Sequence, residues 1–263
     1  MRLLLALTIS TFAACSSAQD WAKKKLDASP RHQEWVTVKN GGRDVKCFVV
    51  YPERQHPVHA LILIHEIMGM SDWVESVADE VAAAGYIAIA PDFLSGMGPN
   101  GGRTDSFPDL QHIREAISGL PASQVVGDLN AACDYAKTIP SCDGKIAVAG
   151  FCWGGSQSFN FATARPGLSA AFVFYGTPPA SAAMAGIGCP VYGFYGGMDN
   201  RVSSTVPKAT DDMKSAGKKY EPTIYGGAGH GFMRTGQQSD PQGPNKKARD
   251  AAWAKVLSVL GKV

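Results

Sequence analysis

Residues 145–164 read KIAVAGFCWGGSQSFNFATA, and this stretch decides the fold. The apolar run from Lys145 to Ala149 predicts a buried strand, and residues 154–163 predict a helix. Between them lies the turn GFCWGG, with Cys152 at its apex. The turn requires glycine at the flanking positions, because a sharp turn strains the backbone at the apex and side chains two positions away would collide. The order strand, tight turn, helix predicts that Cys152 is presented at the carboxyl end of a strand.

Patterns typical of strands and helices alternate along the rest of the chain. We expect further strands at 34–39, 45–51, 60–65, 86–90, 168–175, 191–195 and 220–225, and helices at 71–84, about 107–117, 122–138, 206–216 and 246–260. This alternation indicates an α/β fold with a mostly parallel, twisted sheet and helices on both faces. The first two strands are expected to form an antiparallel edge. Sites in such sheets lie at the carboxyl ends of the strands.

Length and charge limit the possible functions. The chain has 263 residues, enough for one large core, so we expect residues 19–263 to form a single domain. A net charge of +2 without basic blocks argues against nucleic-acid binding. The histidines do not have the spacing of metal ligands, and the Gly-Gly pairs lack the Lys-Ser/Thr of a phosphate-binding loop. We therefore expect neither a metal nor a cofactor.

The N-terminus has the pattern of an export signal at residues 1–18. Arg2 is followed by a short apolar run, Leu3–Ala14, and then by small residues up to Ala18. The run is too short to span a bilayer as a helix, and no other stretch is long and apolar enough to do so. A periplasmic or secreted protein is expected. Lipid attachment at Cys15 is the alternative, because the residues before it loosely resemble a lipobox.

The number of cysteines becomes informative once residues 1–18 are removed. Five remain, namely Cys47, Cys133, Cys142, Cys152 and Cys189. In an oxidising compartment an odd number leaves at least one thiol unpaired. Cys133 and Cys142 are the candidates for a disulfide, because a chain turning back after the 122–138 helix could bring them together. Cys47 and Cys189 lie on expected strands and are interpreted as buried small apolar residues, which leaves Cys152 to be explained.

Two further motifs fit a nucleophile at Cys152. In α/β-hydrolases a nucleophile on such a turn is followed by an acid and then by a histidine, each after a later strand. GFYGGMD places Asp199 after one strand, and YGGAGHGF places His230 after the last. His230 would accept the thiol proton and Asp199 would orient the imidazole. The turn also points Cys152 at the positive end of a helix, which favours the thiolate.

From about Val36 to its end, the chain resembles the dienelactone hydrolases, also called carboxymethylenebutenolidases. The motifs that carry the resemblance are HEIMG, GFCWGG, YGGMD and GAGHGFMR. The resemblance implies a catalytic triad of Cys152, Asp199 and His230. It also implies that Glu66 interacts with the resting thiol and helps to deprotonate it when substrate binds.

The same resemblance implies the groups that hold the substrate. The backbone N–H groups of Ile67 and Trp153 would form the oxyanion hole, and Arg234 would bind a substrate carboxylate. A second carboxylate-binding arginine has no clean counterpart here; Arg114 is the better candidate and Arg103 the other. Tyr175 could line the pocket or be an ordinary aromatic residue at a strand end.

The function implied is hydrolysis of small esters or lactones through a thioester on Cys152, and we expect a monomer without cofactor. The export signal departs from the cytoplasmic setting usual for lactonases that degrade aromatic compounds. An exported carboxylesterase of broad specificity with the same triad is therefore one alternative. A non-catalytic ligand-binding relative is another. A thiol-redox protein is disfavoured, because Cys152 is not part of a C-x-x-C pair.

Overall fold

The computed structural model describes residues 19–238 and 243–263. The predicted signal peptide, residues 1–18, and the alternative lipidation site at Cys15 lie outside the described residues. In the described part of the chain, no helix combines the length and the apolar character needed to cross a membrane.

An eight-stranded sheet forms the centre of the molecule, with the strand order β1-β2-β4-β3-β5-β6-β7-β8. The strands are β1 (Gln33–Asn40), β2 (Arg43–Val50), β3 (Val58–Ile64), β4 (Ile87–Pro91), β5 (Cys142–Phe151), β6 (Ala170–Phe174), β7 (Val191–Gly196) and β8 (Tyr220–Tyr225). Strand β2 pairs antiparallel with both β1 and β4, and the pairs from β4 to β8 are parallel. The predicted mostly parallel sheet with an antiparallel edge is confirmed.

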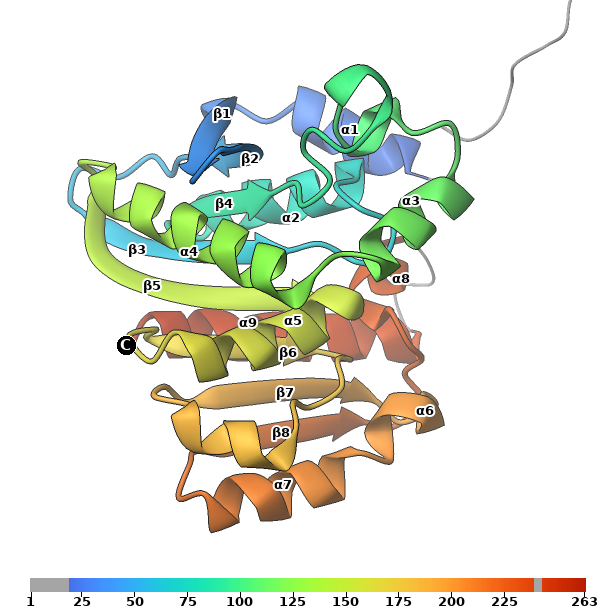
Figure 1. Ribbon diagram of the computed structural model, residues 1–263. Coiled ribbons are helices and arrows are strands. Elements are labelled where there is room, and N and C mark those ends of the chain that lie inside the picture. The colour runs from blue at the N-terminus through green and yellow to red at the C-terminus, as the bar shows by residue number, and fades with distance from the viewer. Residues whose placement is uncertain (1–18, 239–242) are drawn as a thin grey trace, which may run out of the picture.

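Helices cover both faces of this sheet, as Figure 1 shows for α4, α5 and α7 in front and α9 behind. The helices are α1 (Asp20–Asp27), α2 (Asp72–Ala83), α3 (Leu110–Ser118), α4 (Ala122–Thr138), α5 (Trp153–Ala164), α6 (Asn200–Ser203), α7 (Val206–Ser215), α8 (Phe232–Gln238) and α9 (Pro244–Leu260). Short 3-10 turns lie at Pro99–Gly101, Thr104–Ser106 and Ser181–Gly186. The α/β class with helices on both faces is confirmed.

Each face of the sheet has its own apolar core, and the alternation of side chains along β3 shows why. Ile62 and Ile64 pack with α4, α5 and α7, whereas Leu61 and Leu63 pack with α1, α2 and α9. Successive side chains of a strand point to opposite faces, so a strand buried on both faces needs an unbroken apolar run. The sequence VHALILI of β3 meets that requirement. The two cores hold the carboxyl ends of the strands in fixed positions.

The predicted disulfide between Cys133 and Cys142 is not formed, because both residues are free thiols. Cys133 is fully buried on α4, five residues before the helix ends at Thr138, and Cys142 begins β5 beyond that end. Cys133 packs inside the core between α4 and the sheet, whereas Cys142 is only partly buried at the start of β5. A spacing of nine positions was therefore too weak a basis for the pairing.

Candidate active site

Cys152 lies at a strained turn between β5 and α5. Its backbone has φ +57° and ψ −115°, a conformation that L-residues rarely adopt, and its N–H donates to Phe174 O at 3.0 Å. The glycines of the motif permit this turn. A Cβ on Gly150 would lie 1.9 Å from Gly154 O, and a Cβ on Gly154 would lie 2.3 Å from Ile64 O. The backbone thus holds Cys152 at the carboxyl edge of the sheet, tightly packed against the end of β3.

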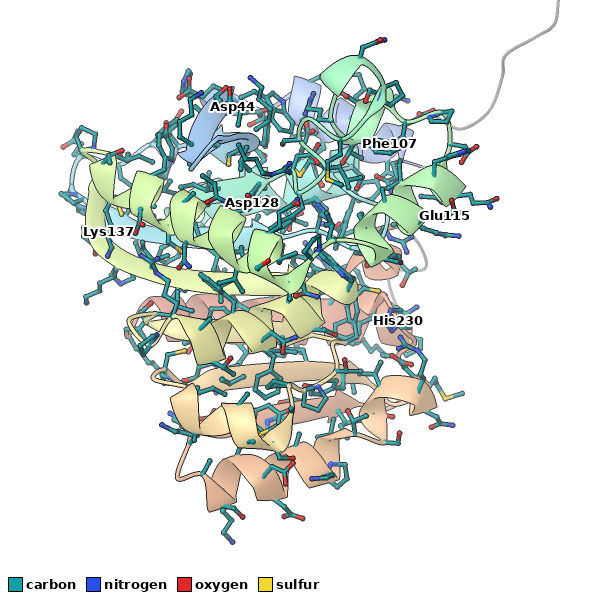
Figure 2. The ribbon with its side chains drawn as sticks, viewed as in Figure 1. Asp44, Phe107, Glu115, Asp128, Lys137 and His230 are labelled. Atoms are coloured by element: carbon teal, nitrogen blue, oxygen red, sulfur yellow. The ribbon has the colours of Figure 1, made fainter. Side chains whose placement is uncertain are left out.

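The structure brings Cys152, His230 and Asp199 together from the ends of three different strands. Cys152 Sγ lies 3.1 Å from His230 Nε2, and His230 Nδ1 lies 2.6 Å from Asp199 Oδ2. Asp199 follows β7 and is buried, and His230 follows β8. Figure 2 shows His230 on the side of the molecule toward which β7 and β8 point. The three side chains form one hydrogen-bonded chain from sulfur to carboxylate.

This chain of contacts changes the protonation of the imidazole. The hydrogen bond with Cys152, followed by the hydrogen bond with Asp199, raises the pKa of His230 above its ordinary value of 6.5, while partial burial opposes the change. The Asp199 carboxylate accepts from Nδ1, so Nε2 is the nitrogen left to exchange a proton with the thiol. The ring is therefore both oriented and stabilised in its charged form.

Glu66 lies beside this triad, at the end of β3, and is almost completely buried. Arg234 Nε donates to its Oε2 at 3.0 Å, and the Tyr175 hydroxyl donates to its Oε1 at 3.3 Å. In the described part of the chain, these two side chains are the hydrogen-bond donors to the carboxylate. The family resemblance implied that Arg234 binds a substrate carboxylate, but did not indicate that it also forms an ion pair with Glu66 across 168 positions of the chain.

Tyr175, for which the sequence left two interpretations open, lies against the histidine. Its ring meets the His230 ring edge-on at a centroid distance of 5.0 Å, and it meets the Phe232 ring at 5.3 Å. Its backbone has a positive φ of +41°. Burial, together with the negative charge of Glu66, raises the pKa of the phenol well above 10.0, so the hydroxyl stays protonated and can donate. Tyr175 thus packs directly against the histidine of the triad.

The backbone N–H groups of Ile67 and Trp153 have no acceptor in the described part of the chain. Trp153 is the first residue of α5, where an N–H has no partner within the helix. Ile67 lies in the loop between β3 and α2. Both residues are half-buried.

The two candidate arginines for a second substrate contact differ in their surroundings. Arg103 lies 3.6 Å above the ring centroid of Trp35 and forms an ion pair with Asp105 at 2.7 Å. Arg114 is exposed on α3, a helix whose Ile113 packs close to Gly69 in the loop after Glu66. Arg114 therefore remains the better candidate.

Comparison with known proteins agrees with this geometry. A model of the dienelactone hydrolase family matches residues 45–263 of the chain. The chain belongs to this family. It is therefore a hydrolase that acts on carboxylic esters.

Relatives and solved structures support the family and the fold. A protein of Methylorubrum extorquens, provisionally named a carboxymethylenebutenolidase, is 29% identical over 201 residues, covering 72% of this chain and 68% of the relative. A provisionally named carboxymethylenebutenolidase of Saccharolobus solfataricus is 29% identical over 256 residues, covering 84% and 95%. A Klebsiella pneumoniae structure, provisionally assigned as a dienelactone hydrolase, superposes with a TM-score of 0.77 at 23% identity, covering 89% of this chain and 99% of that one. That structural likeness shows the α/β-hydrolase fold.

The arrangement found in this dienelactone hydrolase family member can perform acyl transfer. It combines a thiol, a base within hydrogen-bonding distance, an orienting carboxylate and two free N–H donors, which are the groups that nucleophilic catalysis at a carbonyl requires. Among the described residues, no group of three or more His, Cys, Asp or Glu side chains is placed to hold a metal ion. The chemistry at the site can be written with the protein's own groups.

Proposed function

We propose that this protein hydrolyses small esters or lactones through a thioester intermediate on Cys152. The observation that carries the proposal is the 3.1 Å separation between Cys152 Sγ and His230 Nε2, at a turn whose next residue, Trp153, has an unpartnered N–H. Membership of the dienelactone hydrolase family supports the same substrate class.

The proposed reaction has two halves. His230 Nε2 accepts the thiol proton, and the Cys152 sulfur bonds to the carbonyl carbon while the carbonyl oxygen takes the negative charge. The N–H groups of Ile67 and Trp153 stabilise that oxyanion, and such a donor typically lowers the barrier by about 3 kcal/mol. The carbon–oxygen bond then breaks, the leaving alcohol or enolate takes the proton from His230, and a thioester remains. Water gives a proton to His230 and bonds to the thioester carbon. The carbon–sulfur bond then breaks, the acid is released, and the sulfur takes the proton back from His230.

A thiolate is a good nucleophile and a weak base, so it suits substrates with a stabilised leaving group such as the enolate of an opened lactone. Arg234 supports a substrate that carries a carboxylate. The guanidinium donates to Glu66 through Nε at 3.0 Å, so its two terminal nitrogens would be the donors to the substrate carboxylate. Arg114 on α3 is the proposed second contact.

The intermediate can be tested by intact mass spectrometry after acid quenching of a brief incubation with a cis-dienelactone or with p-nitrophenyl acetate. Wild-type protein should gain one acyl group, and Cys152→Ala should gain none and lose turnover. The matched control is Cys142→Ala, which removes a partly exposed thiol elsewhere in the fold and should acylate normally. An acyl group on the Cys152→Ala protein, or unchanged hydrolysis by it, would refute the proposal.

A broad carboxylesterase on the same triad is the second candidate, favoured by one observation. The partner that a carboxylate-bearing substrate needs, Arg234, is already paired with Glu66, and a neutral ester leaves that pair undisturbed. Comparison of kcat/KM for acetyl and butyryl esters and for anionic lactones decides between them. A preference for neutral esters of more than about tenfold, which corresponds to about 1.4 kcal/mol, would favour the carboxylesterase.

We also propose that the enzyme is exported and works as a monomer, with residues 1–18 removed as a signal peptide. The mass of the exported protein tests this, because cleavage after Ala18 leaves Gln19 at the N-terminus. Recovery in a membrane fraction with a lipid on Cys15 would support the alternative. Light scattering on the purified protein tests the monomer.

A further inference from the structure

His65 is a buried side chain that the proposed mechanism does not use. It lies directly after β3 and before Glu66, and its exposed fraction is 0%. Its Nδ1 lies 2.8 Å from Glu66 O. Its ring stacks on Trp153 with a centroid distance of 5.5 Å and an interplanar angle of 19°, and Phe93 meets the His65 ring edge-on. A buried polar ring in this place needs an explanation.

The contacts of His65 define which nitrogen carries the proton. A carbonyl oxygen only accepts, so Nδ1, which faces Glu66 O, is the protonated nitrogen. Burial lowers the pKa of His65 below 6.5, against the opposing charge of Asp92, and the ring is therefore neutral. Nε2 is then the unprotonated nitrogen, and it is buried with no hydrogen-bond partner in the described part of the chain. His65 thus acts as a donor through Nδ1 alone.

The acceptor of this bond belongs to the same peptide unit as one oxyanion donor. Glu66 O and the N–H of Ile67 are the two polar ends of one planar peptide, and in a trans peptide they point in opposite directions. Gly69 N–H also donates to Glu66 O, at 3.0 Å. Two donors on the oxygen fix the direction of the Ile67 N–H, and they polarise the peptide so that this N–H becomes a stronger donor.

The ring of His65 reaches the other oxyanion donor. Its stacking partner Trp153 supplies the second free N–H, and Phe93 also meets the indole edge-on at 5.6 Å. The backbone after Trp153 also packs tightly against the backbone at His65, since a Cβ on Gly154 would lie 2.4 Å from His65 O. One side chain therefore contacts both segments that present an N–H to the substrate.

We infer that His65 is a positioning residue for the oxyanion hole, orienting the Ile67 N–H through its Nδ1–H and the Trp153 N–H through its ring. The inference rests on the proposed function, because it concerns the acylation of Cys152. His65 itself touches neither the thiol nor the substrate.

Two reactions of Cys152 separate this role from a general effect on the site. Acylation by p-nitrophenyl acetate forms an oxyanion and needs both N–H donors. Alkylation by iodoacetamide displaces iodide at a saturated carbon, forms no oxyanion, and reports only on the thiolate and the fold. The ratio of the two second-order rate constants, acylation over alkylation, therefore measures the oxyanion hole alone.

His65→Phe keeps a ring to stack on Trp153 and removes the Nδ1–H donor. Complete loss of one oxyanion donor lowers the rate by about 10²–10³, so misorientation of Ile67 should lower the ratio in His65→Phe by about tenfold or more, with alkylation within about twofold of wild type. His65→Asn restores an N–H near the position of Nδ1 without the ring, and its ratio should lie between those of His65→Phe and wild type.

Three results would overturn the inference. The first is a wild-type ratio in His65→Phe, and the second is an equal slowing of both reactions in that variant. If His65→Phe does not fold, His65→Asn decides because it lacks the ring, and an equal slowing of both reactions in that variant is the third. A wild-type protein that is alkylated on Cys152 but never acylated would instead refute the proposed function, and the inference with it.

Discussion

Backbone strain at single residues is concentrated at the site. Cys152 and Tyr175 both have positive φ, at +57° and +41°, and both contact His230. Such conformations cost about 1–3 kcal/mol each and persist only where the surroundings impose them. Here the imposing contacts are backbone hydrogen bonds, from Cys152 N–H to Phe174 O and from Tyr175 N–H to Phe194 O. The strain aims the sulfur and the phenol ring at the imidazole.

The protonation of His230 leads to a prediction for the pH dependence of acylation. The hydrogen bond with Cys152, and after it the hydrogen bond with Asp199, raises the pKa of His230 above its ordinary value of 6.5. The neutral ring that accepts the thiol proton is therefore the main form only above that raised pKa. The acid limb of kcat/KM should therefore have its midpoint above 6.5. Asp199→Asn removes part of the raising effect and should move that limb to lower pH, while lowering the plateau by up to about 10⁴-fold.

The measurement is a pH–rate profile with a neutral ester, which has no ionisation of its own in this range. Asp199→Glu keeps the negative charge and serves as the control, and its acid limb should stay near that of the wild type. An acid limb in Asp199→Asn at the wild-type position or above would show that the carboxylate does not act on the imidazole.

Arg234 leads to a prediction that separates binding from chemistry. Arg234→Gln should raise KM for a carboxylate-bearing lactone by about tenfold to a hundredfold, since a hydrogen bond to a charged group contributes about 1.5–3 kcal/mol. KM for a neutral ester should change little. Arg103→Gln is the matched control, because Arg103 already stacks on Trp35 and pairs with Asp105. An equal rise of KM for both substrates in Arg234→Gln would contradict the assignment.

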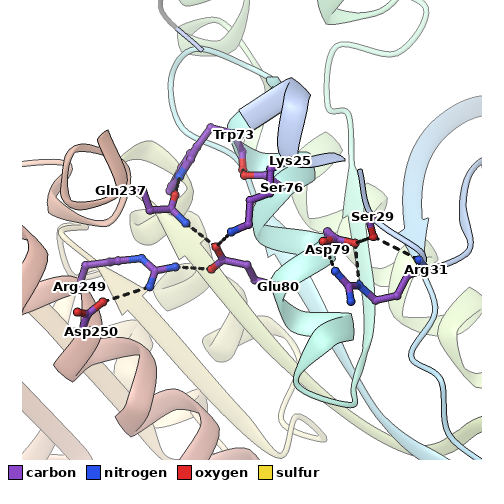
Figure 3. Close-up of polar contacts among 10 residues, drawn as sticks. All are labelled: Lys25, Ser29, Arg31, Trp73, Ser76, Asp79, Glu80, Gln237, Arg249 and Asp250. Atoms are coloured by element: carbon purple, nitrogen blue, oxygen red, sulfur yellow. Dashed lines mark hydrogen bonds and ion pairs between the residues drawn. The ribbon is translucent and has the colours of Figure 1, made fainter. Parts of the chain in front are cut away.

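At the scale of elements, α8 is the helix that carries Arg234, and a polar network holds it in place (Figure 3). Trp73 Nε1 on α2 donates to Gln237 Oε1 at 2.6 Å, and Gln237 Nε2 donates to Glu80 Oε1 at 2.6 Å. Glu80 also binds Lys25 of α1 and Arg249 of α9. Trp73 in addition meets Phe151, the residue before Cys152, edge-on at 5.1 Å. The network therefore joins α8 to the turn of the nucleophile.

Trp73→Phe should test the effect of this network on both stability and binding. The substitution keeps an aromatic ring against Phe151 and removes the hydrogen bond to Gln237, so the free energy of unfolding should fall by about 1–3 kcal/mol. The substitution also removes one of the hydrogen bonds that hold α8, the helix that carries Arg234. KM for an anionic lactone should therefore rise more than KM for a neutral ester. Trp253→Phe on α9, where the half-buried indole packs on the core, is the control. A loss of stability without any difference between the substrates would limit the network to a structural role.

The same element shows where sequence patterns reach their limit. The strands and longer helices followed from apolar runs and helical spacing, and the order Cys152, Asp199, His230 followed from motifs after strands. Helix α8 was not predicted by any such pattern, because it has only seven residues, follows a glycine-rich loop and contains Gly236. Gly236 is explained only by packing, since a Cβ there would lie 2.6 Å from Asn245 O. Contacts between distant segments, such as Arg234 with Glu66, leave no periodic signal in the chain.

For the molecule as a whole, the sheet explains how distant residues form one site. Glu66 follows β3, Cys152 follows β5, Tyr175 follows β6, Asp199 follows β7 and His230 follows β8. These strands are parallel neighbours, so their carboxyl ends meet at one edge. Each functional side chain sits on a loop whose position is fixed by two apolar cores, which is the general arrangement of sites in open α/β sheets. The α/β order predicted from the sequence therefore also predicted the edge at which the site lies.

The free thiols of Cys133 and Cys142 lead to a prediction for the alkylation of the whole protein. The described residues contain five free cysteines, and Cys15 lies within residues 1–18, so unfolded protein that lacks residues 1–18 should take up five carbamidomethyl groups from iodoacetamide without prior reduction. Under native conditions the reaction should favour Cys152, because burial raises the pKa of Cys133 to about 12 and that of Cys189 to about 11 and leaves little thiolate at neutral pH. Peptide mapping of the native reaction against the unfolded one measures both quantities. If the unfolded, unreduced protein takes up only three carbamidomethyl groups, and Cys133 and Cys142 are both unmodified, then these two cysteines form a disulfide.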